Sequence, residues 1–94
     1  MTKNDLIVGI AQATGFRQVK VKKVVQLLFD SIIEVLASEG RIELRNFGVF
    51  EVRTRKARLA RNPRTGEIIP VPARKMVKFK PGKRMEAIIE QGGL

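Results

Sequence analysis

The chain has 94 residues and a formal net charge of +10, from 19 lysines and arginines against nine acids, and it contains neither histidine nor cysteine. The missing residue types exclude disulfides, exclude the usual zinc ligands and remove the usual general base and thiol nucleophile, so we expect neither an enzyme nor a metal or cofactor site. A chain this basic attracts polyanions, and one small domain with a marginal core is expected to gain stability as an obligate dimer.

Helical periodicity covers the first part of the chain. Thr2 and Asp5 have the spacing of a capping box, and apolar residues then recur at helical spacing as far as Gly15, which predicts a first helix. A second helix is predicted from Gln18 to Gly40. Its long apolar stripe, opposite a polar face, is assigned to the core and to a dimer interface. The stripe consists of Val21, Val24, Val25, Leu28, Phe29, Ile32, Val35 and Leu36.

The apolar period changes from 3.6 to about two after Gly40, which predicts strands with one dry and one charged face. The strands are followed by a Pro-Gly break and a last short helix. Because helices and strands are segregated along the chain, the predicted class is α+β with a three-stranded antiparallel sheet. These elements are a strand at 41–45, a turn at 46–48, a second strand from 50, a third strand at 77–80 and a helix at 83–90.

A basic segment built around a proline turn separates the second and third strands. Residues 53–75 contain eight lysines and arginines against one acid and account for +7 of the net charge. The sequence Arg-Asn-Pro-Arg-Thr-Gly at 61–66 is turn chemistry, while Pro70 and Pro72 cannot donate to a strand ladder. We therefore predict a two-stranded ribbon that continues from the sheet and projects as an arm at about 53–76.

The charge of this arm favours a contact with DNA over an ordinary turn. Arginines are attracted to the negative potential of a narrow minor groove, and an exposed proline can enter a base step as a wedge and kink the duplex. Without the surrounding charge, the tip sequence would be interpreted as a simple loop. The candidate DNA contacts on the arm are Arg53, Arg55, Arg58, Arg61, Asn62, Pro63, Arg64, Arg74 and Lys75.

Further candidate contacts lie on the body. The charged outer face of the sheet, partly balanced by Glu43 and Glu51, is predicted by strand parity to include Arg45, Arg53, Arg55, Lys78 and Lys80. Helix starts and glycine turns offer free N–H groups that bind phosphates, and the candidates there are Lys3, Gly48 and Lys83. A solvated strand face, or a cap or turn without a ligand, is the competing interpretation of each.

The aromatic residues indicate which nucleic acid is bound. Tryptophan and tyrosine are absent, and the five phenylalanines lie in or near apolar patterns. Proteins that bind single strands stack bases on exposed aromatic rings, so this chain favours double-stranded DNA. No apolar run reaches the roughly 18 residues of a membrane span, and no secretion signal precedes the first helix. We therefore expect a cytoplasmic protein with neither a membrane nor a small-molecule substrate as its partner.

Three segments resemble the HU and integration host factor family of bacterial nucleoid DNA-binding proteins. They are residues 45–52 (Arg-Asn-Phe-Gly-Val-Phe-Glu-Val), 60–67 (Ala-Arg-Asn-Pro-Arg-Thr-Gly-Glu) and 77–83 (Val-Lys-Phe-Lys-Pro-Gly-Lys), in the order and spacing of the family. The resemblance spans nearly the whole chain. It implies one domain, 1–94, that forms an intertwined dimer with a helical body, three-stranded antiparallel sheets and two long β-ribbon arms.

The resemblance also implies a mechanism. Two arms embrace DNA from the minor-groove side, Pro63 of each arm intercalates at a base step, and Arg61 and Arg64 line the groove. Phosphates on the flanks of the bend are clamped by backbone amides near Thr2, Gly48 and Gly82, together with Lys3 and Lys83. The implied function is that of a nucleoid-associated, histone-like protein that bends DNA and compacts or organises the chromosome.

The sequence does not determine to which branch of the family the chain is more similar, because Pro70 resembles the integration host factor pattern whereas Pro72 resembles the HU pattern. A site-specific subunit in a heterodimer with a paralogue is therefore an alternative to a non-specific homodimer. From other classes, the alternatives are a basic ribonucleoprotein component and a membrane-surface binder, the latter disfavoured because the charge lies on a ribbon. Two departures from the family pattern are Gln18, where a Ser or Thr helix cap is usual, and Leu59-Ala60, which replaces a glycine-containing approach to the tip.

Overall fold

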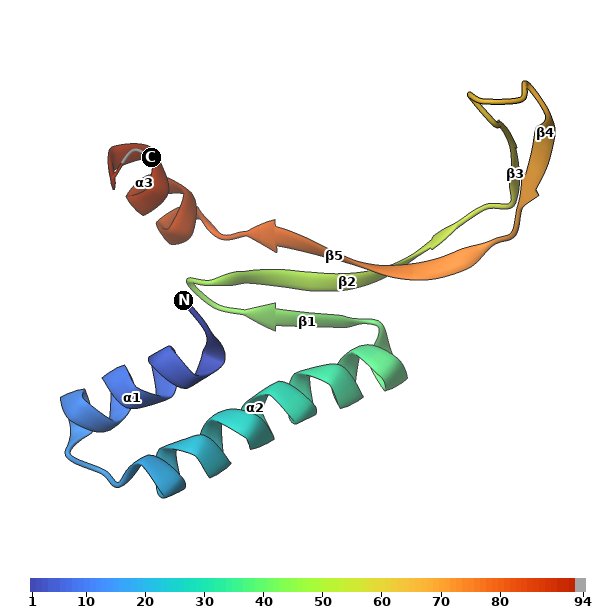
Figure 1. Ribbon diagram of the computed structural model, residues 1–94. Coiled ribbons are helices and arrows are strands. Elements are labelled where there is room, and N and C mark those ends of the chain that lie inside the picture. The colour runs from blue at the N-terminus through green and yellow to red at the C-terminus, as the bar shows by residue number, and fades with distance from the viewer. Residues whose placement is uncertain (93–94) are drawn as a thin grey trace.

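The computed structural model describes residues 1–92, so the last two residues of the predicted domain, 93–94, lie outside the described residues. Two helices, a three-stranded sheet, a separate two-stranded ribbon and a final helix make up the fold (Figure 1). This arrangement confirms the predicted α+β class. The elements are α1 (Lys3–Thr14), α2 (Gln18–Glu39), β1 (Arg41–Leu44), β2 (Gly48–Arg55), β3 (Arg58–Arg61), β4 (Ile68–Val71), β5 (Arg74–Pro81) and α3 (Lys83–Gly92).

The ends of α1 and α2 are determined by the residues that flank them. The Thr2 hydroxyl accepts from the Asp5 amide at 3.4 Å, and the Thr2 amide donates to the Asp5 carboxylate at 2.8 Å, so the predicted capping box is formed. Gly15 and Gly40 end the two helices as predicted, each with a φ of 77° in the left-handed region that favours glycine. The start of α2 has no side-chain cap, because Arg17 occupies the capping position.

β2 is the central strand of the sheet and pairs antiparallel with both β1 and β5. Ile42 pairs with Phe50, Phe50 pairs with Phe79, and the centroids of the two phenylalanine rings are 4.7 Å apart. Paired residues share one face of the sheet, so these side chains form the predicted dry face. This face turns toward α2, and an open hollow of about 310 Å³ between them is lined by Ile33, Leu36, Ala37, Val52, Lys75, Met76 and Val77.

Gly48 begins β2 and lies close against β5. A Cβ at this position would lie 2.5 Å from the Phe79 ring and 2.6 Å from the Lys80 carbonyl oxygen, and Gly48 itself is buried. The approach of β5 therefore accounts for glycine here. Gly48 is buried in the described chain, so it offers less backbone surface than an open turn would, and its contact with DNA stays a prediction.

The arm is interrupted in its middle, unlike the continuous ribbon predicted from the sequence. β1 pairs with β2 only as far as Glu51, and the ladder between β2 and β5 then runs on alone until Arg55 pairs with Arg74. After a gap, β3 and β4 form a second ladder that carries the tip. Pro72 lies in this gap and lacks the N–H that continued pairing would need, which accounts for the break on its leg of the ribbon.

One chain buries very little apolar surface. Among the described residues the buried hydrophobic core consists of Ile7, Ala11 and Val21, which join α1 to α2. The predicted apolar stripe of α2 is covered only in part. Its residues Val25, Ile32, Val35 and Leu36 are half-buried, whereas Val24, Leu28 and Phe29 are exposed. The stripe therefore contributes Val21 to the buried core of the described residues, and its exposed residues remain available to the predicted dimer interface.

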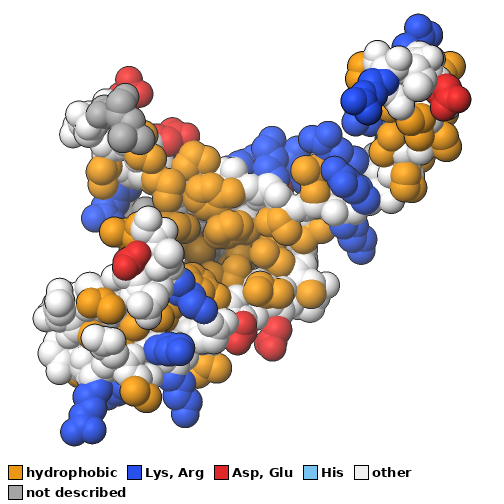
Figure 2. Space-filling view, viewed as in Figure 1, with side chains coloured by type: hydrophobic (Ala, Val, Ile, Leu, Met, Phe, Trp, Pro, Cys, Tyr) orange, Lys and Arg blue, Asp and Glu red, His pale blue; other side chains and the backbone are white. Residues whose placement is uncertain are grey.

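The uncovered apolar side chains gather on one side of the molecule. Figure 2 shows them between the helices, the sheet and α3. α3 stands apart from α1 and α2, beyond the end of the sheet (Figure 1), and its Ile88 and Ile89 are exposed. The exposed apolar residues of α2 and α3, together with those at the edge of the sheet, form this surface. We call it the open apolar face.

Replacing Gly48 by alanine is expected to lower the free energy of unfolding by about 1–3 kcal/mol, because the added methyl group collides with the Phe79 ring and the β5 backbone. The matched control is Gly9→Ala in α1, where nothing lies within 4 Å of an added Cβ. This control should raise stability by about 0.5–1 kcal/mol, since alanine favours a helix interior. Denaturant unfolding followed by circular dichroism measures both. Equal effects at the two sites would contradict the close approach of β5.

Candidate nucleic-acid interface

Cationic side chains follow the arm from the sheet to its tip (Figure 2). β2 and β5 carry the lower part of the arm, and β3 and β4 carry the upper part. The Asn62 side-chain oxygen accepts from the Arg64 amide at 2.9 Å, so Asn62 is a half-buried turn former. The predicted arm cations are all exposed, and they are Arg53, Arg55, Arg58, Arg61, Arg64, Arg74 and Lys75.

Strand pairing determines which cations share the outer face of the sheet. Glu51 pairs with Lys78, and Arg55 pairs with Arg74. Side chains alternate along a strand, so these residues lie on the face opposite Phe50. The predicted position on the charged outer face of the sheet is confirmed for Arg53, Arg55, Lys78 and Lys80. Arg74 lies on the same face.

Two predicted contacts lie away from this face. Arg45 follows the end of β1 at Leu44, because the Phe47 amide turns back to donate to the Leu44 carbonyl at 2.9 Å. Arg45 is therefore a turn residue. The prediction that it belongs to the charged strand face is wrong. Lys75 pairs with Thr54, on the dry side of the sheet, and lines the hollow beside α2.

The upper arm presents charge on both of its faces and has an exposed proline at its tip. Arg58 pairs with Val71 and Arg61 pairs with Ile68, and the two arginines, three residues apart on β3, point to opposite faces. The amide of Gly66 donates to the Asn62 carbonyl at 2.8 Å and closes the turn that exposes Pro63. A narrow ribbon of this kind can enter a groove and meet both of its walls.

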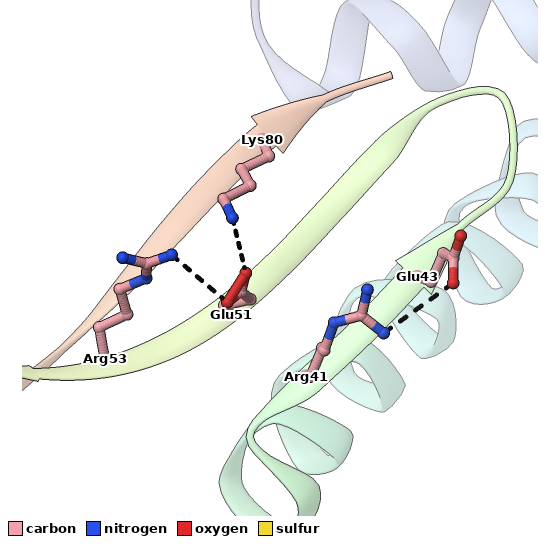
Figure 3. A network of polar contacts seen from close by, with 5 residues as sticks. All are labelled: Arg41, Glu43, Glu51, Arg53 and Lys80. Carbon is pink, nitrogen blue, oxygen red and sulfur yellow. Dashed lines mark ion pairs between the residues drawn. The ribbon is translucent and has the colours of Figure 1, made fainter. Parts of the chain in front are cut away.

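An acid on the outer face pairs with two of the cations there (Figure 3). Lys80 Nζ lies 3.2 Å from Glu51 Oε1, and Arg53 Nη2 lies 3.7 Å from Glu51 Oε2. The hydrogen bond and charge of Lys80, helped by Arg53 and Arg41, hold the pKa of Glu51 below its usual value, against an opposing effect of desolvation. Lys80 and Arg53 are thus partly neutralised within the chain, and a phosphate would compete with Glu51 for them.

The helix starts offer fewer free amides than predicted. The Thr2 amide is used in the capping box, and the Gly82 amide donates to the Phe47 carbonyl at 2.8 Å. The first helical hydrogen bond of α3 runs from the Glu86 amide to the Gly82 carbonyl at 3.0 Å, so the amides of 83–85 are those that a helix start leaves unpaired. Lys83 is exposed beside them. The Lys3 ammonium donates to the side-chain oxygen of Gln26.

Two exposed cations next to the predicted contacts were not proposed from the sequence. Lys56 lies in the gap of the arm, and Arg84 lies in the first turn of α3. Their position beside Arg55 and Lys83 in the sequence was the available signal. Within residues 1–92, no group of three His, Cys, Asp or Glu side chains could hold a metal ion. In the same part of the chain, no helix combines the length and the apolar character needed to cross a membrane.

Comparisons with known proteins agree with this geometry. The family model described as "Bacterial DNA-binding protein" matches residues 1–90. Integration host factor subunit alpha of Hydrogenovibrio crunogenus is 40% identical over 93 residues, which cover 99% of this chain and 96% of that protein. DNA-binding protein HU of Geobacillus stearothermophilus is 42% identical over 90 residues, 96% of this chain and 100% of that protein. The Anabaena HU-DNA cocrystal structure matches with a TM-score of 0.85 at 32% identity, covering 95% of this chain and 97% of that chain.

Replacing Glu51 by glutamine is expected to remove a pH-dependent part of the stability. The pKa of Glu51 is lowered in the folded chain, so its ionised form stabilises the fold above the unfolded pKa, and this contribution is lost as the pH falls through the folded pKa. At neutral pH the variant should therefore unfold at a lower urea concentration than the wild type, and the difference should vanish in acid.

Urea unfolding at neutral pH and at about pH 3, below the ordinary glutamate pKa, measures this difference. Glu43→Gln is the control, because its carboxylate makes one ion pair, of 3.9 Å, with Arg41. A difference between wild type and E51Q that persists unchanged in acid would show that Glu51 acts through packing instead of charge.

Proposed function

Because the chain belongs to the family of bacterial DNA-binding proteins that includes HU and integration host factor, we propose that its arm enters the minor groove of double-stranded DNA and bends the duplex. The protein is a histone-like DNA-binding architectural protein, and its action on the chromosome is compaction or organisation in association with the nucleoid. This function requires neither a catalytic group nor a cofactor. In this proposal residues 1–94 form one DNA-binding domain, with the arm at about 53–76.

The observation that carries this proposal is the arm, where a ribbon too narrow to have a core of its own holds cations on both faces and an exposed proline at its tip. Arg58 and Arg61 point to opposite faces, as the two walls of a groove require. Arginine is drawn to the negative potential of a narrow minor groove. Pro63 then acts as the apolar wedge that partly unstacks a base step and kinks the duplex.

The body is proposed to hold the DNA on either side of the kink. The outer face of the sheet continues the charge of the arm through Lys78 and Lys80. Lys3, and Lys83 with the unpaired amides of the first turn of α3, are suited to phosphates that lie farther from the kink. These contacts read no base edges, so they favour binding that depends on shape and charge instead of sequence.

We infer that a second copy of the chain covers the open apolar face. Val24, Leu27 and Leu28, on one side of α2, are 59%, 57% and 54% exposed, and Ile88 and Ile89 on α3 are 57% and 61% exposed. Exposed apolar side chains on this scale mark an interface, and the three-residue core of the described chain is too small to stabilise it alone. Pairing supplies two arms, one for each side of a bend. A paralogue with the same apolar face is the alternative partner.

A site-specific, integration-host-factor-type subunit is the second candidate, because a subunit alpha of that protein and an HU are similar to this chain at 40% and 42% identity. Competition binding separates the two. A site-specific protein should prefer its site over random duplex by at least about a thousandfold, whereas a non-specific one should be displaced equally by both.

The affinity for duplex DNA is expected to fall steeply with salt, because the proposed contacts release counterions from phosphates. The logarithm of the binding constant should fall linearly with that of the salt concentration, with a slope of about −0.9 per phosphate neutralised. Arg61→Gln should make this slope shallower by about 1. Fluorescence anisotropy with a short duplex in a salt series measures both. An affinity that does not change with salt would rule out the proposed interface.

Pro63→Ala is expected to reduce DNA bending more than DNA binding. Unstacking a base step costs a few kcal/mol, so losing the wedge should reduce protein-assisted circularisation of a short duplex by about tenfold or more, equivalent to at least about 1.4 kcal/mol. Pro70→Ala, an exposed proline on the leg of the same arm, is the matched control and should leave circularisation unchanged. If P63A circularises DNA as well as the wild type does, Pro63 is not the wedge.

A further inference from the structure

A second basic surface lies on α2 and is not part of the interface described above. It consists of Arg17, Lys20 and Lys23, which we call the α2 patch. Together with Lys22, which lies on another side of α2, these are the only charged residues from Leu6 to Phe29, and no acid occurs in that range. The three side chains of the patch are exposed.

Nothing in the described chain neutralises the α2 patch. The ion pairs found within residues 1–92 all lie in the sheet and involve none of these cations. The Lys20 ammonium instead lies 4.5 Å from the ring centroid of Phe16, which is itself half exposed. The patch therefore presents its charge to solvent.

The placement of these cations works against the stability of α2. Arg17, Lys20 and Lys23 follow one another at a spacing of three residues, so like charges are stacked on one helix face. They also lie at the start of the helix, where the macrodipole disfavours positive charge, and the first turn contains no acid. A charge pattern that breaks these local rules is expected where an external anion compensates for it.

The α2 patch and the arm lie at opposite ends of the molecule. In Figure 1 α2 begins at the lower left and the arm tip lies at the upper right, and the chain measures 58 Å along its longest axis. Figure 2 shows Lys and Arg side chains projecting from the lower end as well as from the arm. A duplex that crosses the arm is therefore separated from this surface by the body.

We propose that the α2 patch binds the phosphate backbone of a second DNA duplex, so that the protein bridges two DNA segments. The proposal rests on the proposed function, since the first segment is the one held by the arm. Two of the three cations are lysines, which are flexible point charges suited to phosphates irrespective of sequence. A dimer would carry two such patches.

The test uses a biotinylated duplex on beads, the full-length protein, and a second, fluorescent duplex in solution at low salt. The wild type should capture the second duplex. The triple variant R17Q/K20Q/K23Q should lose capture by about tenfold or more, because up to three phosphate contacts are removed. Its affinity for a single short duplex and its circularisation activity should stay within about twofold of the wild type. The charge-conserving variant R17K/K20R/K23R is the matched control and should retain capture.

Each other outcome is informative. Equal losses of capture, single-duplex affinity and circularisation would mean that the patch holds the flank of the same bent duplex, which would overturn the bridge. Unchanged capture would mean that the patch is only a solvated helix face, which would also overturn the bridge. Failure of the wild type to bind a single duplex would refute the proposed function itself. The glutamine variant should melt no lower than the wild type, since it removes repulsion from α2, so unfolding cannot mimic the expected loss.

Discussion

The scarcity of buried surface within one chain is the constraint on which the rest of the structure depends. Ile7, Ala11 and Val21 form a core that joins α1 to α2 but reaches neither the sheet nor α3. The sheet and α2 enclose a hollow that their own side chains do not fill, and α3 is held through its first turn. The dimer partner proposed above would bury the open apolar face and bring two arms into one assembly, so the burial of apolar surface and the binding of DNA would have one common requirement.

The arm exists because the two long strands continue where the third one stops. β1 ends its pairing at Glu51, and beyond it β2 and β5 continue as a two-stranded ladder that faces α2 only at the hollow beside Val52 and Lys75. Past this hollow the ribbon has no core to cover, so the segment is free to carry charge. Prolines on the returning leg and many arginines also protect its exposed edges from pairing with other chains. Because the arm has no core to cover, its surface can be cationic, and it is narrow enough to enter a groove.

Local chemistry made most of the fold predictable from the sequence. The Thr2–Asp5 capping box, the left-handed glycines that end both helices and the alternation around Phe50 each act within a few residues, and each was predicted correctly. The features that the sequence did not reveal depend on contacts between segments far apart in it. The approach of β5 to Gly48, and the use of the Gly82 amide by Phe47, depend on such tertiary contacts. Among the site residues, the alternation of side chains along a strand correctly predicted the cations of the outer face. It failed for Arg45, because the strand ends in a turn before this residue.

Sedimentation equilibrium of the purified protein without DNA, combined with urea unfolding at several protein concentrations, tests the central claim most directly. We predict a species of twice the 10.6 kDa chain mass and an unfolding midpoint that rises with protein concentration, because folding and association are coupled when one chain cannot bury its own apolar face. A folded monomer whose unfolding midpoint is independent of concentration would contradict it.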